Sequence, residues 1–155
     1  REGQWRKGRK RHMDARSEMS REGGVEAAVE RENIGGGVMY ELVQGELPFM
    51  LAGSIRDDGP LRDTITDAVE AQTAIRGQAQ DADLVLMLST LLHSVAVGNC
   101  LPSTTKVVCV DINPATVTQL LDRGSAQAVG MVTDIGTFVP VLAEQVAEIA
   151  AGSTE

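Results

Sequence analysis

The chain has 155 residues, of which 43% are hydrophobic and 23% charged, a composition typical of one soluble globular domain with a real core. Eight of its fourteen basic residues lie before residue 23, which leaves six basic against eighteen acidic residues, a net charge of about −12, on the rest. This balance argues against binding to nucleic acid, and no apolar run approaches the ~18 residues of a membrane helix, so we expect neither partner.

The cysteines and histidines exclude the common metal sites. Cys100 and Cys109 are nine residues apart, which is neither a C-x-x-C nor a zinc-ligand spacing. His12 and His93 are the only histidines, so we predict no transition metal. Reduced thiols and the lack of a secretory pattern indicate a cytoplasmic protein. The first residue is Arg1 rather than Met, and we expect a fragment of a longer chain.

The distribution of charge and composition predicts three regions. Residues 1–23 form a basic head that we expect to be poorly ordered, although its segment RKGRKRH could instead contact polyphosphate or an acidic neighbour. Residues 24–150 form the predicted domain, and residues 151–155 form a short tail.

The predicted domain begins with two short helices, at 24–31 and 38–44. Gly45 follows the second helix and is predicted to occupy its C′ position. The triple glycine 35–37 lacks the G-x-G-x-x-G spacing and follows no convincing strand, so we do not predict a dinucleotide loop there. It loosens the entry to the helix instead.

From residue 48 onward, apolar runs precede small or acidic loops and longer amphipathic stretches, which is typical of alternating strands and helices. The predicted strands are 48–53, 84–88, 106–110 and 128–132, and the predicted helices are about 61–77, 114–122 and 136–150. Runs such as LVLML do not alternate polar with apolar residues, so we expect both strand faces to be covered. The pattern predicts an α/β fold, a three-layer Rossmann-like parallel sheet with right-handed crossovers.

In such a sheet the loops that follow the strands meet at the carboxyl edge, where free helix N–H groups face the ligand. The polar residues of these loops are therefore candidate ligand contacts. They are Arg56, Asp57, Asp58, Ser89, Thr90, His93, Ser94, Asp111, Thr133 and Asp134.

Several candidates also have a structural interpretation. Asn113 can cap the following helix, which leaves Asp111 free to accept ribose hydroxyls, or Asp111 can serve its own loop. His93 lies four residues after a possible cap, Ser89, and either contacts a ligand or is a satisfied structural histidine. Asp134 is either a ligand contact or a helix N-cap.

The segment IRDDGP allows two interpretations as well. It can be a surface turn in which Gly59 and Pro60 reverse the chain. In the functional interpretation, Arg56 holds a carboxylate by a bidentate pair, and Asp57 or Asp58 accepts a ribose hydroxyl or a substrate ammonium. A dinucleotide pyrophosphate would be held by other backbone amides, such as those of the turn 89–92.

Three long strings carry a family resemblance: PFMLAGSIRDDGPL, DADLVLMLSTLLHSVAVGNCLP and VVCVDINPATVTQLLDRGSAQAVGMVTDIG. They resemble the C-terminal part of the archaeal-type ornithine cyclodeaminase family, once labelled a LOR/SDH bifunctional enzyme domain. Related domains are fused behind an arginine dihydrolase in cyanobacteria. The resemblance runs over about residues 34–148.

The resemblance implies an ornithine cyclodeaminase, a lyase that converts L-ornithine to L-proline and ammonia with NAD as cofactor. It also implies a sheet similar to the NAD-binding domain of deoxyhypusine synthase. NAD⁺ would take a hydride from the α-carbon, the δ-amine would capture the imine with loss of ammonia, and the hydride would return to the cyclic imine. The protein would align the nicotinamide, neutralise the substrate carboxylate and exclude water.

The resemblance also implies site residues. The family's NAD contacts fall on Asp58, Thr90, Leu91, Leu92, His93, Asp111, Asp134 and Ile135. We hypothesise that Arg56 binds the substrate carboxylate and that Asp57 accepts a proton. An N-terminally truncated sheet would expose an edge strand, so we expect a homo-oligomer or association with an upstream portion of the same protein, and incomplete activity for the chain alone.

Two other functions remain open. The same edge could bind a nucleotide without turnover, in a binding or assembly module. The older family label implies a saccharopine dehydrogenase-type oxidoreductase instead.

Overall fold

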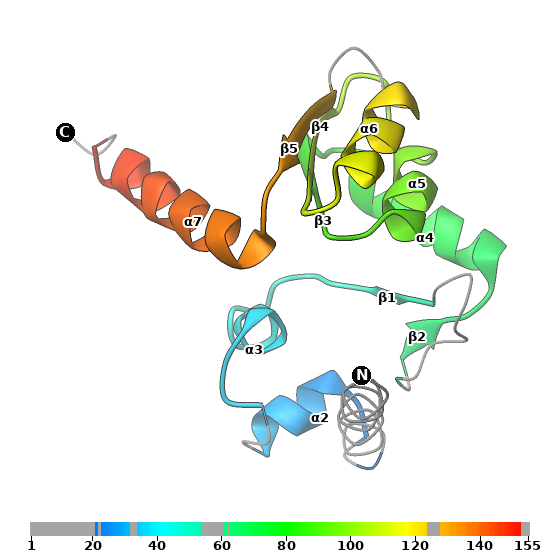
Figure 1. Ribbon diagram of the computed structural model, residues 1–155. Coiled ribbons are helices and arrows are strands. Elements are labelled where there is room, and N and C mark those ends of the chain that lie inside the picture. Colours follow the sequence, from blue (N-terminus) through cyan, green and yellow to red (C-terminus); the bar gives the residue numbers. More distant parts are fainter. Residues whose placement is uncertain are drawn as a thin grey trace, which may run out of the picture. The chain divides into compact units, whose positions relative to one another are not determined.

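The computed structural model describes residues 21, 23–31, 34–53, 61, 63–123 and 128–152 (Figure 1). The chain divides into two compact units, 1–71 and 72–155. The division falls within α4 (Ala68–Ala79), inside the stretch that the sequence predicts as one domain. Nearly all of the predicted basic head lies outside the described residues.

Ahead of α4, the described residues of unit 1 form two helices and a short parallel pair of strands. They are α2 (Val25–Glu30), α3 (Val38–Gln44), β1 (Leu51–Ala52) and β2 (Thr64–Ile65). Both predicted helices are confirmed, whereas the predicted strand 48–53 is reduced to two residues. The predicted helix start near residue 61 is wrong, because Thr64 and Ile65 pair with β1 and α4 begins only at Ala68.

Helix α3 ends in a Schellman motif whose left-handed residue is not a glycine. The N–H of Leu47 donates to the carbonyl of Leu42 at 2.9 Å, and the N–H of Glu46 donates to the carbonyl of Val43 at 3.1 Å. Glu46 has a φ of 51°, whereas Gly45 has a φ of −84°. The prediction that Gly45 occupies C′ is therefore wrong by one residue, and a side chain with a Cβ occupies the position that favours glycine.

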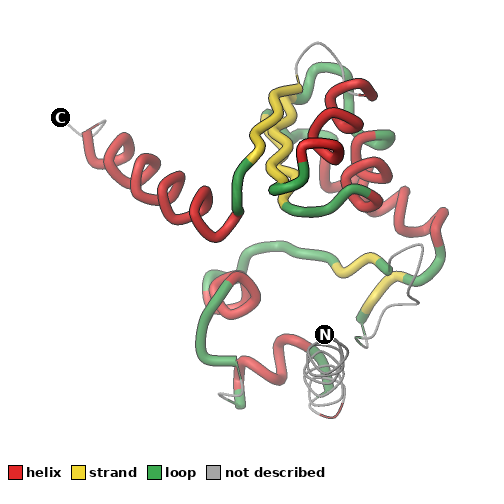
Figure 2. The backbone as a smooth tube through the Cα atoms, viewed as in Figure 1, coloured by secondary structure: helices red, strands yellow, loops and turns green. Residues whose placement is uncertain are grey.

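Unit 2 contains a three-stranded parallel sheet in the order β3-β4-β5 (Figure 2). Its strands are β3 (Leu84–Leu88), β4 (Lys106–Asp111) and β5 (Ala128–Val132), and its helices are α5 (Leu92–Gly98), α6 (Pro114–Arg123) and α7 (Ile135–Gly152). The three predicted strands and the helices that follow β4 and β5 are confirmed. Helix α5, which the sequence did not predict, begins within the loop expected after strand 84–88.

One face of this sheet carries the core of the unit. Met87 lies opposite Cys109, and Cys109 lies opposite Gly130, so these three residues share a face. Met87 and Cys109 form a buried cluster with Leu120 of α6, and the thiol of Cys109 donates to the sulfur of Met87 at 3.8 Å. Because Gly130 has no side chain, α6 can approach the sheet closely at this point. A Cβ on residue 130 would lie 2.4 Å from a methyl group of Val117.

The opposite face of the sheet is only partly covered. Leu84 and Leu86 are 52% and 40% exposed, and Val129 and Met131 have the same two values. The sequence predicted burial of both faces, which is confirmed for the end of the central strand β4, where Cys109 and Val110 are both 1% exposed, and is wrong for the outer strands β3 and β5. In a sheet whose parallel strands follow one another in order, right-handed crossovers place α5 and α6 on the same side, as Figure 1 shows, so neither helix covers the second face.

Helix α7 is long, apolar and exposed. None of its residues is buried, and its 18 residues have a mean hydropathy of 1.2. By length and composition alone, it is the one helix of the described residues that could cross a membrane, which is weak evidence for such a role. The prediction that no apolar stretch approaches the length of a membrane helix is therefore wrong for this segment. The helix also extends to Gly152, into the predicted tail.

Candidate functional site

The carboxyl edge of the unit 2 sheet brings three of the predicted loops together. The N–H of Ser89, after β3, donates to the carbonyl of Val110 at 2.8 Å, and the N–H of Thr133, after β5, donates to the carbonyl of Asp111 at 3.1 Å. The loops after β3, β4 and β5 therefore leave the sheet side by side, in the order that the parallel topology imposes. The predicted convergence of these loops holds within unit 2.

Asp111 ends β4 and is 9% exposed at this edge. Its Oδ1 accepts the backbone N–H of Asn113 at 2.7 Å, and Oδ1 of Asn113 accepts the backbone N–H of Ala115 at 3.0 Å. The predicted cap of α6 by Asn113 is confirmed. Asp111 is not wholly free, because one of its oxygens orders the loop. Its Oδ2 has no hydrogen bond to the described part of the chain.

The loop after β3 differs from the prediction at two serines. Ser89 has a φ of 55°, a left-handed conformation, and α5 is capped by Leu91 without a side-chain hydrogen bond. Ser89 is therefore not the predicted cap. Ser94 is buried, and its hydroxyl donates to the carbonyl of Thr90, so it serves the helix rather than the edge. The Ser94 hydroxyl thus satisfies a backbone carbonyl at the start of α5.

The remaining residues of this loop lie at the start of α5. His93 is the second residue of the helix and is half-buried, as are Thr90 and Leu91, whereas Leu92 is exposed. Since no side chain caps α5, its first backbone N–H groups are not used by a capping oxygen. The sequence predicted such free backbone N–H groups in the turn 89–92, for a dinucleotide pyrophosphate.

Asp134 lies at the corresponding position after β5. Its Oδ2 accepts the backbone N–H of Thr137 at 3.1 Å in the first turn of α7, so the N-cap interpretation is confirmed. The carboxylate is exposed, and the neighbouring Ile135 is half-buried. Asp134 and Asp111 thus each use one oxygen for their own loop.

The three predicted residues of the IRDDGP loop are not placed. Arg56, Asp57 and Asp58 lie outside the described residues, so both the substrate-binding hypothesis and the NAD contact of Asp58 stay predictions.

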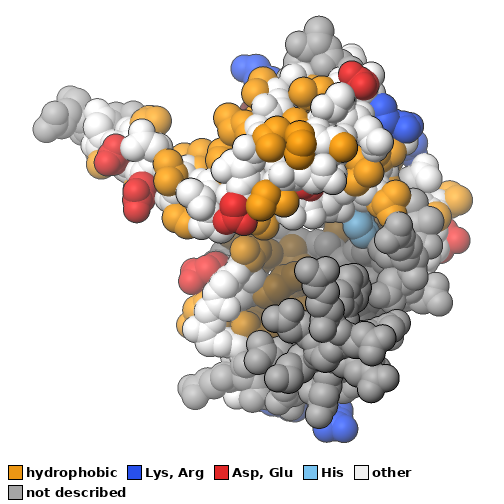
Figure 3. All heavy atoms as spheres, viewed as in Figure 1, with side chains coloured by type: hydrophobic (Ala, Val, Ile, Leu, Met, Phe, Trp, Pro, Cys, Tyr) orange, Lys and Arg blue, Asp and Glu red, His pale blue; other side chains and the backbone are white. Residues whose placement is uncertain are grey.

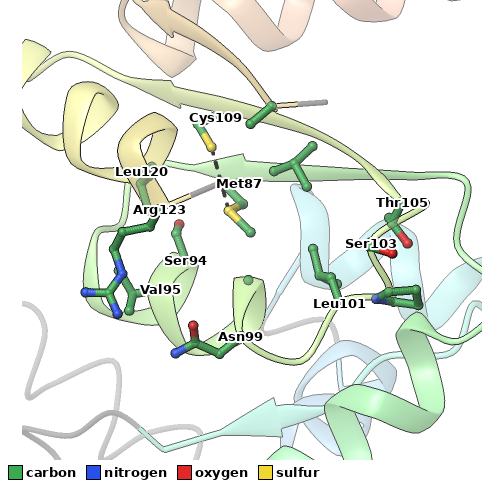
Figure 4. Close-up of a pocket in the computed structure, with 14 residues that line it drawn as sticks. Met87, Ser94, Val95, Asn99, Leu101, Ser103, Thr105, Cys109, Leu120 and Arg123 are labelled. Atoms are coloured by element: carbon green, nitrogen blue, oxygen red, sulfur yellow. Dashed lines mark hydrogen bonds between the residues drawn. The ribbon is translucent and has the colours of Figure 1, made fainter. Parts of the chain in front are cut away.

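A cavity of about 110 Å³ lies beneath α5 and α6, away from the predicted site (Figure 4). Its lining includes Val107 and Ala128, near the starts of β4 and β5, together with Asn99, which follows α5, and Arg123, the last residue of α6. It therefore lies toward the amino edge. Burial raises the pKa of Cys109 in its wall, which keeps this thiol protonated and poorly reactive. Sequence reasoning missed the cavity, because packing between helices leaves no local pattern.

Comparisons with known proteins agree with this geometry. Residues 1–142 match the family described as "Arginine dihydrolase ArgZ-like, C-terminal, Rossmann fold", a match that includes the basic head. An ornithine cyclodeaminase of Methanothermobacter thermautotrophicus is 54% identical over 140 residues, which cover 90% of this chain and 34% of that protein. The bifunctional arginine dihydrolase/ornithine cyclodeaminase ArgZ of Synechocystis is 51% identical over 144 residues, which cover 93% of this chain and 20% of that protein.

The chain is also similar to a solved structure of this kind of protein. The ternary complex of AgrE with ornithine and NAD⁺ has a TM-score of 0.80 and 48% identity, and the match covers 92% of this chain and 21% of that one. The chain thus spans at most about a third of the curated relatives named above. The Rossmann fold and the use of NAD are supported by the family and by this complex. The chain therefore belongs to the ArgZ-like C-terminal Rossmann family.

Proposed function

We propose that this chain supplies the NAD-binding part of an ornithine cyclodeaminase that converts L-ornithine to L-proline and ammonia. One observation carries the proposal: the loops after β3, β4 and β5, with Thr90 to His93, Asp111 and Asp134, lie side by side at one edge. The relatives named ornithine cyclodeaminase and the AgrE complex with ornithine and NAD⁺ support it.

The described residues fit a dinucleotide. Asp111 presents a carboxylate oxygen, Oδ2, that is not used by its own loop, and a carboxylate at the end of a parallel strand accepts ribose hydroxyls. The uncapped start of α5 offers backbone N–H groups to an anionic group such as a pyrophosphate. Asp134 would contact the ligand through the oxygen that does not cap α7.

The protein's part in the reaction is to hold the reactants in place. Bound NAD⁺ would supply hydride transfer, and Asp111 would orient the cofactor through its ribose. Leu92 and Ile135, which begin α5 and α7 at the same edge, would exclude water from the reacting carbon, whereas Leu91 packs against the core cluster of Met87, Cys109 and Leu120. Arg56 would neutralise the substrate carboxylate, and Asp57 would accept a proton.

Asp111→Asn is the most direct test of the cofactor site. Asparagine keeps an oxygen for the N–H of Asn113 and so preserves the turn, but it replaces the acceptor Oδ2 by a donor. We expect NAD⁺ binding, measured by calorimetry, to weaken about 10- to 100-fold, since hydrogen bonds to charged groups contribute about 1.5–3 kcal/mol. Asp122→Asn on the exposed surface of α6 makes the same charge change and should bind as the wild type does. Equal affinities for all three proteins would refute the assignment.

The reaction is tested in a hybrid of full length. In it this chain replaces the matched third of the Methanothermobacter enzyme, to which it is 54% identical over 140 residues. With ornithine and NAD⁺, the hybrid should release proline and ammonia without net accumulation of NADH. A dehydrogenase would accumulate NADH, and a binding module would bind NAD⁺ without either product. Either of these results would replace the proposed activity.

A further inference from the structure

The cavity beneath α5 and α6 has a buried apolar wall. Met87 of β3, Cys109 of β4 and Leu120 of α6 line the cavity and are 7%, 1% and 7% exposed. Leu101 and Val107 pack against the same cluster and extend the apolar lining. A surface of this kind favours an aliphatic group, because the transfer of apolar surface out of water is favourable.

One end of the cavity carries a positive charge. Arg123 and Asn99 line the cavity and are exposed, at the C-terminal ends of α6 and α5 (Figure 4). Arg123 is the only charged residue among the described residues of the lining, and its guanidinium forms no ion pair with any of the residues that the structure describes. Ser103 and Thr105, which Figure 4 shows toward the opposite end, are uncharged. An anionic group in this cavity would therefore pair with Arg123.

The net charge of unit 2 makes this end of the cavity an exception. Among its described residues the unit has three basic side chains, Arg76, Lys106 and Arg123, against seven acidic ones. The acidic residues are Asp81, Asp83, Asp111, Asp122, Asp134, Glu144 and Glu148, and none of them lines the cavity. Figure 3 shows acidic side chains along α7, which has no basic residue. A small anion is therefore repelled by most of the unit, whereas the Arg123 guanidinium can hold a carboxylate by two parallel hydrogen bonds.

The size of the cavity limits the length of a ligand. Its volume is about 110 Å³, and an apolar cavity of about 150 Å³ holds one molecule of benzene. By proportion, an aliphatic chain of about four carbon atoms fits inside, beyond a carboxylate at the Arg123 end. A much longer chain would have to displace Met87 or Leu120, which are packed in the core of the unit.

We propose that this cavity binds a short aliphatic monocarboxylate, with about five carbon atoms in all. The carboxylate pairs with Arg123 and accepts a hydrogen bond from the side-chain amide of Asn99, and the chain lies against Met87 and Leu120. The cavity lies toward the amino edge of the sheet, whereas the predicted NAD contacts of unit 2 lie at its carboxyl edge. It is thus a second ligand site, and it does not rest on the proposed function.

Two arginines allow a matched test with sodium pentanoate. Arg123 and Arg76 are both exposed and lie in the last turn of a helix, but of the two only Arg123 lines the cavity. We expect pentanoate to bind the whole chain with a dissociation constant of about 1 mM or less, and to shift the methyl resonance of Met87 in an NMR titration. Arg123→Gln should raise the dissociation constant about 10-fold, because it removes a charge-assisted hydrogen bond. Arg76→Gln should leave the dissociation constant unchanged.

Two further probes separate the charge from the chain. Acetate has the carboxylate without the chain, and butylamine has the chain with the opposite charge, so each should bind at least about 10-fold more weakly than pentanoate. Circular dichroism checks that both arginine variants remain folded. The proposal is overturned if Met87 shows no shift, if the two arginine variants bind pentanoate equally, or if acetate or butylamine binds as tightly as pentanoate.

A titration in the presence of NAD⁺ distinguishes this site from the predicted cofactor site. Saturating NAD⁺ should leave the dissociation constant of pentanoate unchanged, because the two sites lie at opposite edges of the sheet. Displacement of pentanoate by NAD⁺ would show a shared site and overturn the proposal. A chain that binds pentanoate but not NAD⁺ would count against the proposed function and support the second site.

Discussion

Gly130 lies at the closest approach of α6 to the sheet, and a single methyl group there tests this packing. A Cβ would lie 2.4 Å from Cγ1 of Val117 and 2.8 Å from Cδ1 of Leu121. Carbon atoms in favourable contact are about 3.5–4.0 Å apart, so α6 or β5 must move by about 1 Å. Val117 is buried and has a stiff χ1, so rotation of its side chain gives little relief.

The expected cost follows from two opposing effects. Overpacking a core costs about 1–3 kcal/mol, and Gly→Ala stabilises by about 0.4–1 kcal/mol through the unfolded chain. We expect Gly130→Ala to lower the free energy of unfolding by about 1–2 kcal/mol. Urea denaturation followed by circular dichroism gives this value, and labelling of Cys100 and Cys109 reports on unit 2 directly, because both thiols are buried there.

A double variant separates this contact from a general effect of the substitution. Val117→Ala removes the methyl group in conflict, so Gly130→Ala combined with Val117→Ala should cost about 1 kcal/mol less than the sum of the single variants. Gly77→Ala in α4 is the control, because a Cβ there meets nothing within 4 Å, and it should stabilise the helix by up to about 1 kcal/mol. A neutral Gly130→Ala variant, or additivity within about 0.5 kcal/mol, would refute the close approach.

Three further predictions concern other parts of the chain. Burial raises the pKa of Cys109, so above pH 9.0 the unfolded chain loses this proton while the folded chain keeps it. The contribution of Cys109 to the free energy of unfolding should therefore be full below pH 9.0 and fall as the pH rises above it. Urea midpoints of Cys109→Ala should lack this part of the pH dependence. Glu46→Gly should raise the free energy of unfolding by about 1 kcal/mol, because Gly adopts the left-handed conformation without a Cβ penalty, whereas Glu46→Ala should give no gain in the same thermal melts. Asn113→Ala should cost about 1 kcal/mol and speed hydrogen exchange at the start of α6, whereas Asn113→Ser should retain the cap; equal exchange in both variants would contradict the observed hydrogen bond.

The sequence predicted unit 2 more accurately than unit 1. Strands 84–88 and 128–132 match the structure to the residue, because each is a continuous apolar run between turn residues. The parallel arrangement follows from helical segments between them. In unit 1, the strand 48–53 was reduced to Leu51 and Ala52, since a strand forms only where a partner supplies hydrogen bonds, and Thr64 and Ile65 pair with just these two residues.

The candidate site was predicted as a set of loops, and the structure shows which side chains of its described part are used by their own loops. Strand order and direction place Asp111, Asp134 and the residues after β3 at one edge, and both properties follow from the order of strands and helices along the chain. The use of one Asp111 oxygen by Asn113, and the inward turn of Ser94, depend on atoms that meet only after the loops close. Residue type alone does not distinguish a free carboxylate from one that orders its own turn.

The sequence by itself determined the strands of unit 2, the helices after β4 and β5, the parallel direction of the strands and the edge at which a ligand would bind, because hydrophobic period and chain order are properties of short segments. Only the tertiary structure decided that α5 and α6 cover one face of the sheet, that Val117 packs closely against Gly130, and that no residue of α7 is buried. These features depend on distances between segments far apart in the chain. Such distances are set by the packing of side chains in three dimensions, which a linear pattern does not contain.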